Sequence, residues 1–356
     1  MQVLIMPDYR PDNPYQELLA NSLKLQGVNV QFPYGYRRVF PIFRAITNQN
    51  QTIKLLHLHW LNPYLKGDRW FTKLIYSIKL VLDLSLVKSK GYKITWTIHN
   101  SLPHETKFPL LELWSRRLVA KLVDKIIIHQ ASSLEELANL YQFNVAKATV
   151  IPHGNYREVY HSPIPKLEAR KKLDLPLTGL IYLNFGMLRP YKGVDKLLEV
   201  WEQNQKQLQE DTLVIAGKAG DDAYGDKLQA KASQLPRVFL HNSFIEDDLI
   251  HVYFSVADFV VCPFQKILTS GSLILAMSFG KPIIAPRFPT IAETVGKADT
   301  LLYDPQQEDG LLEAIQQSKK EDITALSKVV MSECDRLDWS NISQKTYQVY
   351  KEALAS

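Results

Sequence analysis

The chain has 356 residues, of which 46% are hydrophobic and 22% are charged, and only two of them are cysteines. A chain of this size buries a full core and is more easily built as two domains than as one. Cys262 and Cys334 lie far apart and lack zinc-ligand spacing, which argues against disulfides and structural zinc and for a reducing, cytoplasmic location. Met1 to Met6 already has the pattern of a strand, so we expect no signal peptide.

Positive charge is concentrated in the first half of the chain. Residues 1–160 contain 20 Lys and Arg against 11 Asp and Glu, a net charge of +9, and the remaining residues carry a net charge of −4. This asymmetry predicts an anionic partner for the first half, and a surface bias without function is the alternative. Anionic lipid headgroups and nucleic acid are both candidates, and we expect lipid rather than nucleic acid.

Short apolar runs alternate with segments of helical period along the first 160 residues. Such alternation is typical of a parallel sheet whose strands are joined by crossover helices. The predicted strands are Val3 to Met6, Val28 to Phe32, Ile53 to Leu58, Ile94 to Ile98, Ile126 to Ile128 and Thr149 to Ile151.

The periodicity stops between Tyr156 and Pro165, which indicates an interdomain linker. We therefore predict two doubly wound α/β domains, residues 1–160 and 166–338, with ligand sites at the carboxyl ends of the strands in a cleft between the sheets. A last helix is predicted from about Ile342 to Leu354. The predicted strands of the second domain are Leu180 to Phe185, Leu213 to Ala216, Val238 to Leu240, Phe259 to Cys262 and Pro282 to Ile284.

The first strand runs into a polar loop that contains Asp8, Asn13 and Tyr15 and opens a helix extending to about Leu25. A dinucleotide-binding protein carries its glycine-rich turn at this position. Because the loop lacks the glycines of GxGxxG, the sequence argues against a nicotinamide or flavin cofactor and against a dehydrogenase.

Two further strands of the first domain end in histidines. His57 and His59 share one face of a strand that continues into Trp60, and His99 ends the next apolar run ahead of Asn100. A histidine at a strand end can act as a base or bind a sugar hydroxyl, and a hydrogen-bonded core histidine is the alternative. A zinc site is a weaker interpretation, because no third ligand stands at a telling spacing.

The segment from Arg69 to Lys90 is apolar with interspersed charges. These charges argue against a membrane span, whereas its aromatic and lysine residues are typical of an interfacial helix. A crossover helix buried on the sheet is the alternative. Together with the net charge of +9, the segment favours peripheral contact with the inner face of the plasma membrane.

The most informative stretch of the second domain is a strand that ends at Gly186 and is followed by a loop containing Arg189 and Lys192, with a helix beginning at Val194. Backbone N–H groups, the positive end of a helix dipole and two cations together bind phosphates. The loop therefore predicts a diphosphate-binding site.

A second anion site is predicted where Ser270, Gly271 and Ser272 open an apolar helix. An ordinary helix cap is the alternative. Three elements are candidates for contacting a nucleoside, through a flexible turn, backbone groups and a carboxylate for a ribose, and for the carboxylate an exposed helix-cap role is the alternative. These candidates are Gly217, Phe244 with Ile245, and Glu293.

Taken together, these motifs resemble those of the GT-B glycosyltransferases, specifically the large family of sucrose, mannosyl and glucosyl transferases that use nucleotide-sugar donors. The resemblance covers the whole chain and is most specific in the second half. Its motifs are His59-Trp60, Thr97-Ile-His99-Asn100, Val150-Ile-Pro-His-Gly154, Gly186-Met-Leu-Arg189-Pro-Tyr-Lys192-Gly193 and Ala276-Met-Ser-Phe-Gly280-Lys-Pro282-Ile-Ile-Ala285.

The resemblance implies two Rossmann-like domains, with the donor on the second, the acceptor on the first, and a C-terminal helix over residues 341–356 packed back on the first domain. It implies that Arg189 and Lys192, with Gly186 and the Ser270 to Ser272 helix start, bind the donor diphosphate without a metal. The residues expected to contact the acceptor are Asn13, Tyr15, His59, Trp60 and Asn100.

One departure from the family pattern concerns stereochemistry. Retaining members carry two glutamates eight residues apart, and Ile267 and Leu275 stand at those positions here. The Asn13-Pro-Tyr opening and the Ser-Gly-Ser helix start resemble a subgroup of inverting β-mannosyl or β-glucosyl transferases of polysaccharide and glycolipid assembly. Inversion needs a base from the first domain, for which the candidates are His99, Glu105 and Asp8.

We therefore expect a metal-independent hexosyltransferase without a cofactor, acting from a donor such as GDP-mannose or UDP-glucose on a saccharide or lipid-linked saccharide. A nucleotide-sugar 2-epimerase of the same fold is one alternative. A nucleotide-sugar binding protein without turnover is the other, which the absent glutamates support.

Overall fold

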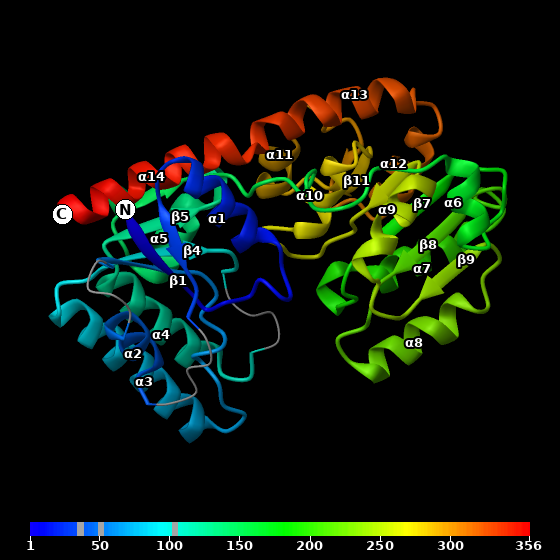
Figure 1. The fold of residues 1–356 in the computed structure, drawn as a ribbon. Helices are drawn as coiled ribbons and strands as arrows, with labels where there is room; N and C mark the ends of the chain where they lie inside the picture. The colour runs from blue at the N-terminus through cyan, green and yellow to red at the C-terminus, as the bar shows by residue number, and fades with distance from the viewer. Residues whose placement is uncertain (34–38, 49–52, 102–105) are drawn as a thin grey trace. The chain divides into compact units, whose positions relative to one another are not determined.

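The computed structural model describes residues 1–33, 39–48, 53–101 and 106–356. The chain forms two compact units, one built from Met1–Gly154 with Leu337–Ser356 and the other from Asn155–Arg336. Figure 1 shows both as layers of helices around a sheet. The sequence placed the domain boundaries at residues 160 and 338, whereas the units divide after Gly154 and after Arg336.

The sheet of the first unit has six parallel strands in the order β2-β1-β3-β4-β5-β6. Its central strands are continuous apolar runs with every residue or nearly every residue buried, as expected for a sheet covered on both faces. The strands are β1 (Gln2–Met6), β2 (Asn29–Gln31), β3 (Leu55–Leu58), β4 (Lys93–Ile98), β5 (Lys125–Ile128) and β6 (Ala148–Val150).

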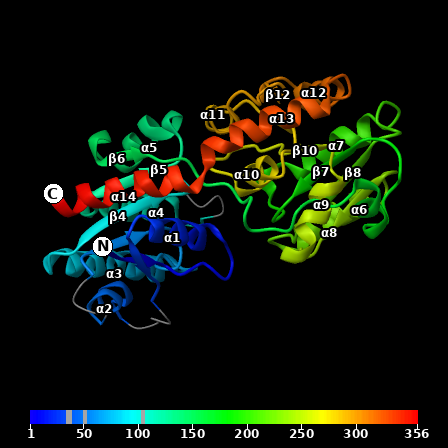
Figure 2. The same ribbon diagram turned by 45° about the horizontal axis from the view of Figure 1, so that its top comes forward.

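Helices cover both faces of this sheet. Figures 1 and 2 show α1 and α14 together on one side and α2 and α3 on the other. The helices of the first unit are α1 (Tyr15–Leu25), α2 (Pro41–Thr47), α3 (Trp70–Ser89), α4 (Pro109–Leu122), α5 (Leu134–Tyr141) and α14 (Trp339–Ala355).

The C-terminal helix α14 belongs to the first unit because its apolar residues recur at helical spacing and pack on the sheet and on α1. Ile342, Val349 and Ala353 lie on its buried face. Small residues bring the two helices close, since Ser22 Oγ donates to the carbonyl oxygen of Trp339 at 2.8 Å.

The second unit repeats the architecture with strand order β12-β11-β10-β7-β8-β9, again all parallel. Its strands are β7 (Ile181–Phe185), β8 (Thr212–Ala216), β9 (Val238–His241), β10 (Phe259–Val261), β11 (Ile283–Pro286) and β12 (Leu302–Tyr303). Its helices are α6 (Lys166–Lys172), α7 (Val194–Gln203), α8 (Asp222–Ala232), α9 (Asp247–Val256), α10 (Gly271–Ser278), α11 (Pro289–Val295), α12 (Gly310–Ser318) and α13 (Ile323–Cys334).

The predicted strands of both series are present, and their ends differ from the prediction by one or two residues. The sequence prediction missed β12, whose two residues are too few to show a period. Within the described ranges, no helix is long and apolar enough to cross a membrane.

Candidate active site

In the second unit, a lysine of the loop after β7 and a serine of α10 lie against the backbone of Gly186. Gly186 has a φ of +109°, a conformation that favours glycine. A Cβ added there would lie 2.6 Å from Ser272 Oγ and 3.2 Å from Lys192 Nζ. Lys192 Nζ itself donates to Ser272 Oγ at 3.4 Å. The fold thus brings the two predicted anion motifs together at one strand end.

Arg189 lies in the same loop and crosses the neighbouring turn after β8. A Cβ at Gly220 would lie 2.1 Å from Arg189 Cζ, so only a glycine leaves room for the guanidinium. Two backbone hydrogen bonds join the loops, from Leu188 N to the Lys218 oxygen at 2.9 Å and from Gly220 N to the Leu188 oxygen at 3.0 Å. The backbone therefore fixes where the Arg189 cation stands.

The surroundings of Lys192 in this loop disfavour its charged form. Desolvation lowers the pKa of Lys192 to about 8, and the positive charge of Arg189 acts in the same direction, while Cys262 opposes it. An anion bound beside both cations relieves this repulsion, because an opposite charge favours the protonated lysine.

The three residues at the start of α10 make different contacts. Ser270 is the N-cap, and its Oγ accepts a hydrogen bond from Leu273 N at 3.2 Å. The helix-cap interpretation thus describes Ser270, whereas Ser272 directs its hydroxyl to Lys192. Gly271 lies near the Tyr156 hydroxyl, which a Cβ would meet at 3.5 Å.

Of the residues expected to contact a nucleoside, Gly217 and the loop with Phe244 and Ile245 lie around one turn, whereas Glu293 lies elsewhere. Gly217 has a φ of +145° and packs on the Gly186 backbone. The loop after β9 is tied to this turn, because Asn242 Oδ1 accepts from Ala219 N at 2.8 Å. In that loop Phe244 is exposed and Ile245 is buried.

Glu293 lies on a different element, α11. That helix reaches the loop before α10 through a hydrogen bond from Thr290 Oγ1 to the Ile267 carbonyl oxygen at 3.3 Å. Ile267 and Leu275, which stand where the family carries glutamates, are apolar, and Leu275 is buried in α10.

In the first unit, buried aromatic and histidine rings collect at the carboxyl ends of the strands. His99 stacks on Trp60 with ring centroids 4.2 Å apart, and His59 lies 5.2 Å from His99. Tyr15 meets His99 edge-on at 5.0 Å. Asn13 Oδ1 accepts from Tyr15 N at 2.9 Å, which places the tyrosine at the start of α1.

These contacts separate the expected acceptor residues into two kinds. Tyr15 and His59 are buried, with 2% and 1% of their surface exposed, so they support the site from below and offer little surface to a ligand. Trp60 is half-buried and Asn100 is exposed, and both line a small cavity together with His59. His57 is a hydrogen-bonded core histidine, whose ring nitrogens lie 2.6 Å from Tyr350 Oη and 2.7 Å from Thr97 Oγ1.

The three candidate bases have different surroundings. Asp8 is held by Arg10 through two hydrogen bonds of 2.9 Å, which engage both of its carboxylate oxygens and lower the pKa of this carboxyl. His99 is buried, and its two ring nitrogens lie 2.9 Å from His59 Nδ1 and 3.1 Å from His129 Nε2. Glu105 lies outside the described residues.

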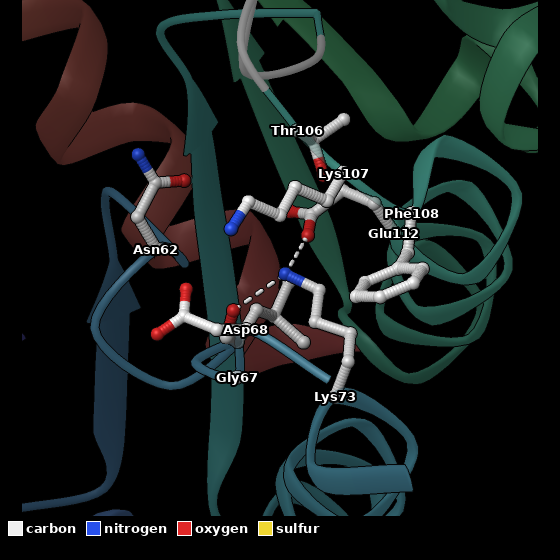
Figure 3. Close-up of a pocket in the computed structure, with 9 residues that line it drawn as sticks. Asn62, Gly67, Asp68, Lys73, Thr106, Lys107, Phe108 and Glu112 are labelled. Atoms are coloured by element: carbon white, nitrogen blue, oxygen red, sulfur yellow. Dashed lines mark hydrogen bonds and ion pairs between the residues drawn. The ribbon is translucent and has the colours of Figure 1, made fainter. Parts of the chain in front are cut away.

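A larger cavity of about 290 Å³ lies in the same unit and shares Asn62 with the small one (Figure 3). Buried charges form its floor: Lys73 pairs with Glu112 and donates to the Leu65 oxygen at 2.5 Å, and Glu112 pairs with Arg116 at 3.0 Å. Polar side chains line it, including those of Asn62, Asp68 and Lys107. Its volume is at the lower end of the range for small-molecule sites.

No group of three or more histidine, cysteine, aspartate or glutamate side chains is arranged to hold a metal ion in the part of the chain that the structure describes. The histidines of the first unit instead bond to one another, to hydroxyls and to backbone carbonyls.

Residues 165–329 match the family model of the glycosyl transferases group 1. The chain is a glycosyltransferase, and its second unit carries the group 1 match. This glycosyltransferase is 26% identical over 303 residues to the GDP-mannose:glycolipid 4-beta-D-mannosyltransferase of Xanthomonas campestris, a match covering 84% of the chain and 80% of the relative. It is 23% identical over 359 residues to the D-inositol 3-phosphate glycosyltransferase of Thermobispora bispora, covering 96% and 78%.

Solved structures share its fold. The sucrose-phosphate synthase of Thermosynechococcus elongatus superposes with a TM-score of 0.75 at 17% identity, covering 99% of both chains. The Anabaena protein HepE, in complex with UDP and glucose, gives a TM-score of 0.73 at 15% identity, also over 99% of both chains. The GT-B fold and the enzyme class expected from the sequence are thereby confirmed.

Sequence reasoning missed one member of the first unit's ring cluster. His129 follows β5 directly and bonds to both His99 and the carbonyl oxygen of Ile151. The signal was available, because His59, His99 and His129 each stand immediately after an apolar strand of the glycosyltransferase.

Proposed function

We propose that this glycosyltransferase transfers a hexose, with inversion and without a metal, from a nucleoside diphosphate sugar to a saccharide or lipid-linked saccharide. The observation that carries the proposal is the meeting of Lys192 and Ser272 over Gly186, with Arg189 in the same loop. Two cations and a helix N-terminus stabilise the negative charge of a departing diphosphate, which is the role a metal plays elsewhere.

We assign the donor to the second unit and the acceptor hydroxyl to the first. Buried Leu275 and apolar Ile267 supply no carboxylate beside the sugar, which supports a single displacement assisted by a base of the first unit. GDP-mannose is our first donor and a glycolipid our first acceptor, because a relative that shares most of its length with this chain is named for them. UDP-glucose is the second donor.

An anionic membrane surface is the proposed location, and α3 supports it by an inverted pattern. Polar residues of this helix face inward: Lys73 pairs with Glu112, and Asp83 accepts from the backbone of Ile42 at 2.9 Å. Leu80, Leu84 and Val87 share the buried face, whereas many other apolar residues face outward. The most exposed of these on α3 and the neighbouring α4 are Trp70, Phe71, Ile75, Ile78, Leu82, Leu110 and Trp114.

An exposed apolar helix face beside lysines fits the interface of a bilayer with anionic headgroups, and it places the enzyme where a lipid-linked acceptor lies. The net charge of +9 over residues 1–160 supports the cytoplasmic leaflet. Flotation with phosphatidylglycerol vesicles tests this: we expect recovery with anionic vesicles and its loss in Phe71→Asp with Ile75→Asp. Equal recovery of the wild type with neutral vesicles, or none with either, contradicts it.

Transfer itself is tested with radiolabelled GDP-mannose or UDP-glucose and octyl β-D-glucoside in EDTA. Labelled disaccharide is the expected product, and its anomeric configuration by NMR reports inversion. Label found only in an epimerised nucleotide sugar favours the 2-epimerase. Nucleotide binding without product from any acceptor favours the binding protein.

A further inference from the structure

Three buried histidines stand at equivalent places on three neighbouring strands. His59, His99 and His129, which we call the histidine row, directly follow β3, β4 and β5, and these strands are adjacent in the sheet. Because the ends of adjacent parallel strands lie side by side, the rings form a continuous series. His59 Nδ1 lies 2.9 Å from His99 Nε2, and His99 Nδ1 lies 3.1 Å from His129 Nε2.

The far end of the row sets the direction of every hydrogen bond in it. His129 Nδ1 lies 3.0 Å from the carbonyl oxygen of Ile151, which can only accept, so His129 carries its proton on Nδ1. A neutral histidine has one donor nitrogen and one acceptor nitrogen. His129 Nε2 therefore accepts from His99 Nδ1, and His99 Nε2 accepts from His59 Nδ1.

This order leaves His59 Nε2 as an acceptor that no donor reaches. The atom is buried and has no hydrogen-bond partner among the described residues. His59 and His99 line a cavity of about 10 Å³ together with Asn62, Asn100 and Arg116. Such a volume admits one water-sized group, for example a single hydroxyl. Asn62 also lines the larger cavity of Figure 3, so the two cavities adjoin.

The titratable and charged groups that face the row come from four elements. Tyr15 of α1 and His57 of β3 pack on it, His153 lies beyond β6, and Arg116 of α4 lines the small cavity. Arg116 is itself paired with Glu112. Glu112 also pairs with Lys73, so a hydroxyl entering this cavity meets neutral rings and an Arg116 cation whose carboxylate partner is shared.

The row is neutral at pH 7. Desolvation holds the pKa of His59 and of His99 well below the usual histidine range, and it lowers that of His129 to about 4. The hydrogen bond to the Ile151 oxygen raises the pKa of His129 relative to burial alone. A proton taken up by the row is thus held best at its far end.

We propose that the histidine row removes the proton of the acceptor hydroxyl, with His59 Nε2 as the atom that contacts the hydroxyl and His129 as the final proton carrier. The inference rests on the proposed transfer and moves the base from His99, whose two nitrogens are both engaged, to His59.

One proton crosses the row from the acceptor hydroxyl to His129. As the acceptor oxygen bonds to the anomeric carbon and the diphosphate leaves with its electron pair, the hydroxyl proton passes to His59 Nε2. The Nδ1 proton of His59 moves to His99 Nε2, and the Nδ1 proton of His99 moves to His129 Nε2. One O–H and two N–H bonds break, three N–H bonds form, and the positive charge rests on His129. The proton returns to water by the reverse path when the products leave.

The hydrogen-bond order is tested without any activity. In the full chain labelled with ¹⁵N-histidine, two-bond ¹H–¹⁵N spectra should show His59, His99 and His129 as Nδ1–H tautomers that do not titrate between pH 5 and 8. Exposed His161, outside the first unit, serves as the internal reference for signal assignment. An Nε2–H tautomer at any of the three positions overturns the proposal, even if the enzyme transfers sugar as proposed.

Proton transfer is then separated from ring positioning by two variants at one site. His129→Gln keeps an oxygen that accepts from His99 but cannot carry a proton, and His129→Leu removes both functions. With GDP-mannose and octyl β-D-glucoside, we expect kcat to fall at least tenfold in His129→Gln, with unchanged KM for the donor, since a positioned base contributes about 10²–10⁴-fold. Wild-type kcat in His129→Gln alongside a loss in His129→Leu means that the row only positions His59, and it overturns the relay.

A matched control uses a neighbouring buried histidine outside the row. The ring centroids of His57 and His59 lie 4.2 Å apart, and His57 bonds to two hydroxyls. His57→Gln therefore makes a similar change without altering a residue of the relay. We expect its kcat within threefold of wild type and GDP affinity unchanged in every variant. If His57→Gln and His129→Gln lose kcat equally, general damage to the cluster explains both, and the relay is rejected.

Discussion

The two units share one fold but differ in the side chains at the carboxyl ends of their strands, which are charged in the second unit and neutral in the first. The second unit offers charge on bare backbone: Lys192 and Ser272 meet over Gly186, and the pKa of Lys192 falls to about 8 because its charge is poorly solvated. The first unit offers neutral rings: among its described residues, five histidines in or after its strands are buried, and burial lowers their pKa values. In the proposed reaction, the same sheet edge serves an anionic leaving group in one unit and a neutral hydroxyl in the other.

The largest effect that sharpens this contrast is expected from a side chain at Gly186. Gly186→Val places a Cβ 2.6 Å from Ser272 Oγ in a left-handed backbone region, so the loop must open and the two anion motifs separate. We expect GDP and UDP binding, measured by calorimetry, to weaken by more than about 100-fold, which corresponds to roughly 3 kcal/mol.

Gly91 supplies the control for that change. It has a φ of +81°, and a Cβ there meets nothing within 4 Å. Gly91→Val therefore carries similar backbone strain, but it lies in the first unit and should leave nucleotide affinity intact. Equal affinities in Gly186→Val and wild type place the diphosphate elsewhere.

Removing the cations one at a time is expected to have the next largest effect. Lys192→Ala should weaken binding of GDP or UDP by about 10-fold to 100-fold, in line with 1.5–3 kcal/mol for a hydrogen bond to a charged group. Arg189→Ala should mainly slow transfer, because a cation that stabilises the departing diphosphate acts in the transition state. Steady-state kinetics with calorimetry checks both, and wild-type values in both variants contradict the assignment of this loop.

Acid should destabilise the first unit more than the second, because of its buried histidines. Their folded-state pKa values lie below the unfolded value of 6.5, so the unfolded chain binds more protons as the pH falls below that value. Each fully buried histidine should then remove roughly 2 kcal/mol of stability between pH 6.5 and pH 5.

Hydrogen exchange read by mass spectrometry at pH 7 and pH 5 can follow the two units separately. After correction for intrinsic exchange rates, protection should fall in β3, β4 and β5 and stay nearly constant in β7 and β8. An equal loss of protection in both units would contradict a special role of the buried histidines in acid destabilisation.

Sequence patterns predicted the fold well because it depends on local regularities. Continuous apolar runs marked the parallel strands, and the glycine after Phe185 with two following cations marked the loop to which we assign the diphosphate. Contacts between distant segments were out of reach. Tyr15 reads as an exposed loop aromatic, yet it is buried because Trp339 packs on it from the other end of the chain, with ring centroids 5.2 Å apart.

The α3 helix illustrates the same limit. Its period does not reveal which face is buried, since the partner of Lys73 is Glu112, a residue of the following helix. Only the folded structure shows that Lys73 and Asp83 face inward while the aromatic residues at the start of the helix face outward. Likewise, a histidine after each of three strands becomes a hydrogen-bonded row only once β3, β4 and β5 are known to be neighbours.

The smallest expected effect concerns the pH dependence of nucleotide binding, which separates the charge of Lys192 from its shape. The free protein holds the ammonium with a pKa of about 8, and a bound diphosphate favours the charged form. Above pH 8 the lysine must take up a proton to bind, so affinity for GDP or UDP should fall about tenfold between pH 7 and pH 9. Arginine stays charged over this range, so Lys192→Arg should bind with nearly constant affinity. Calorimetry in buffers of different ionisation enthalpy would also count the proton taken up at pH 8.5. If the arginine variant loses affinity as steeply as the wild type, the pH dependence arises outside this loop, and the contrast between a charged and a neutral strand end no longer rests on Lys192.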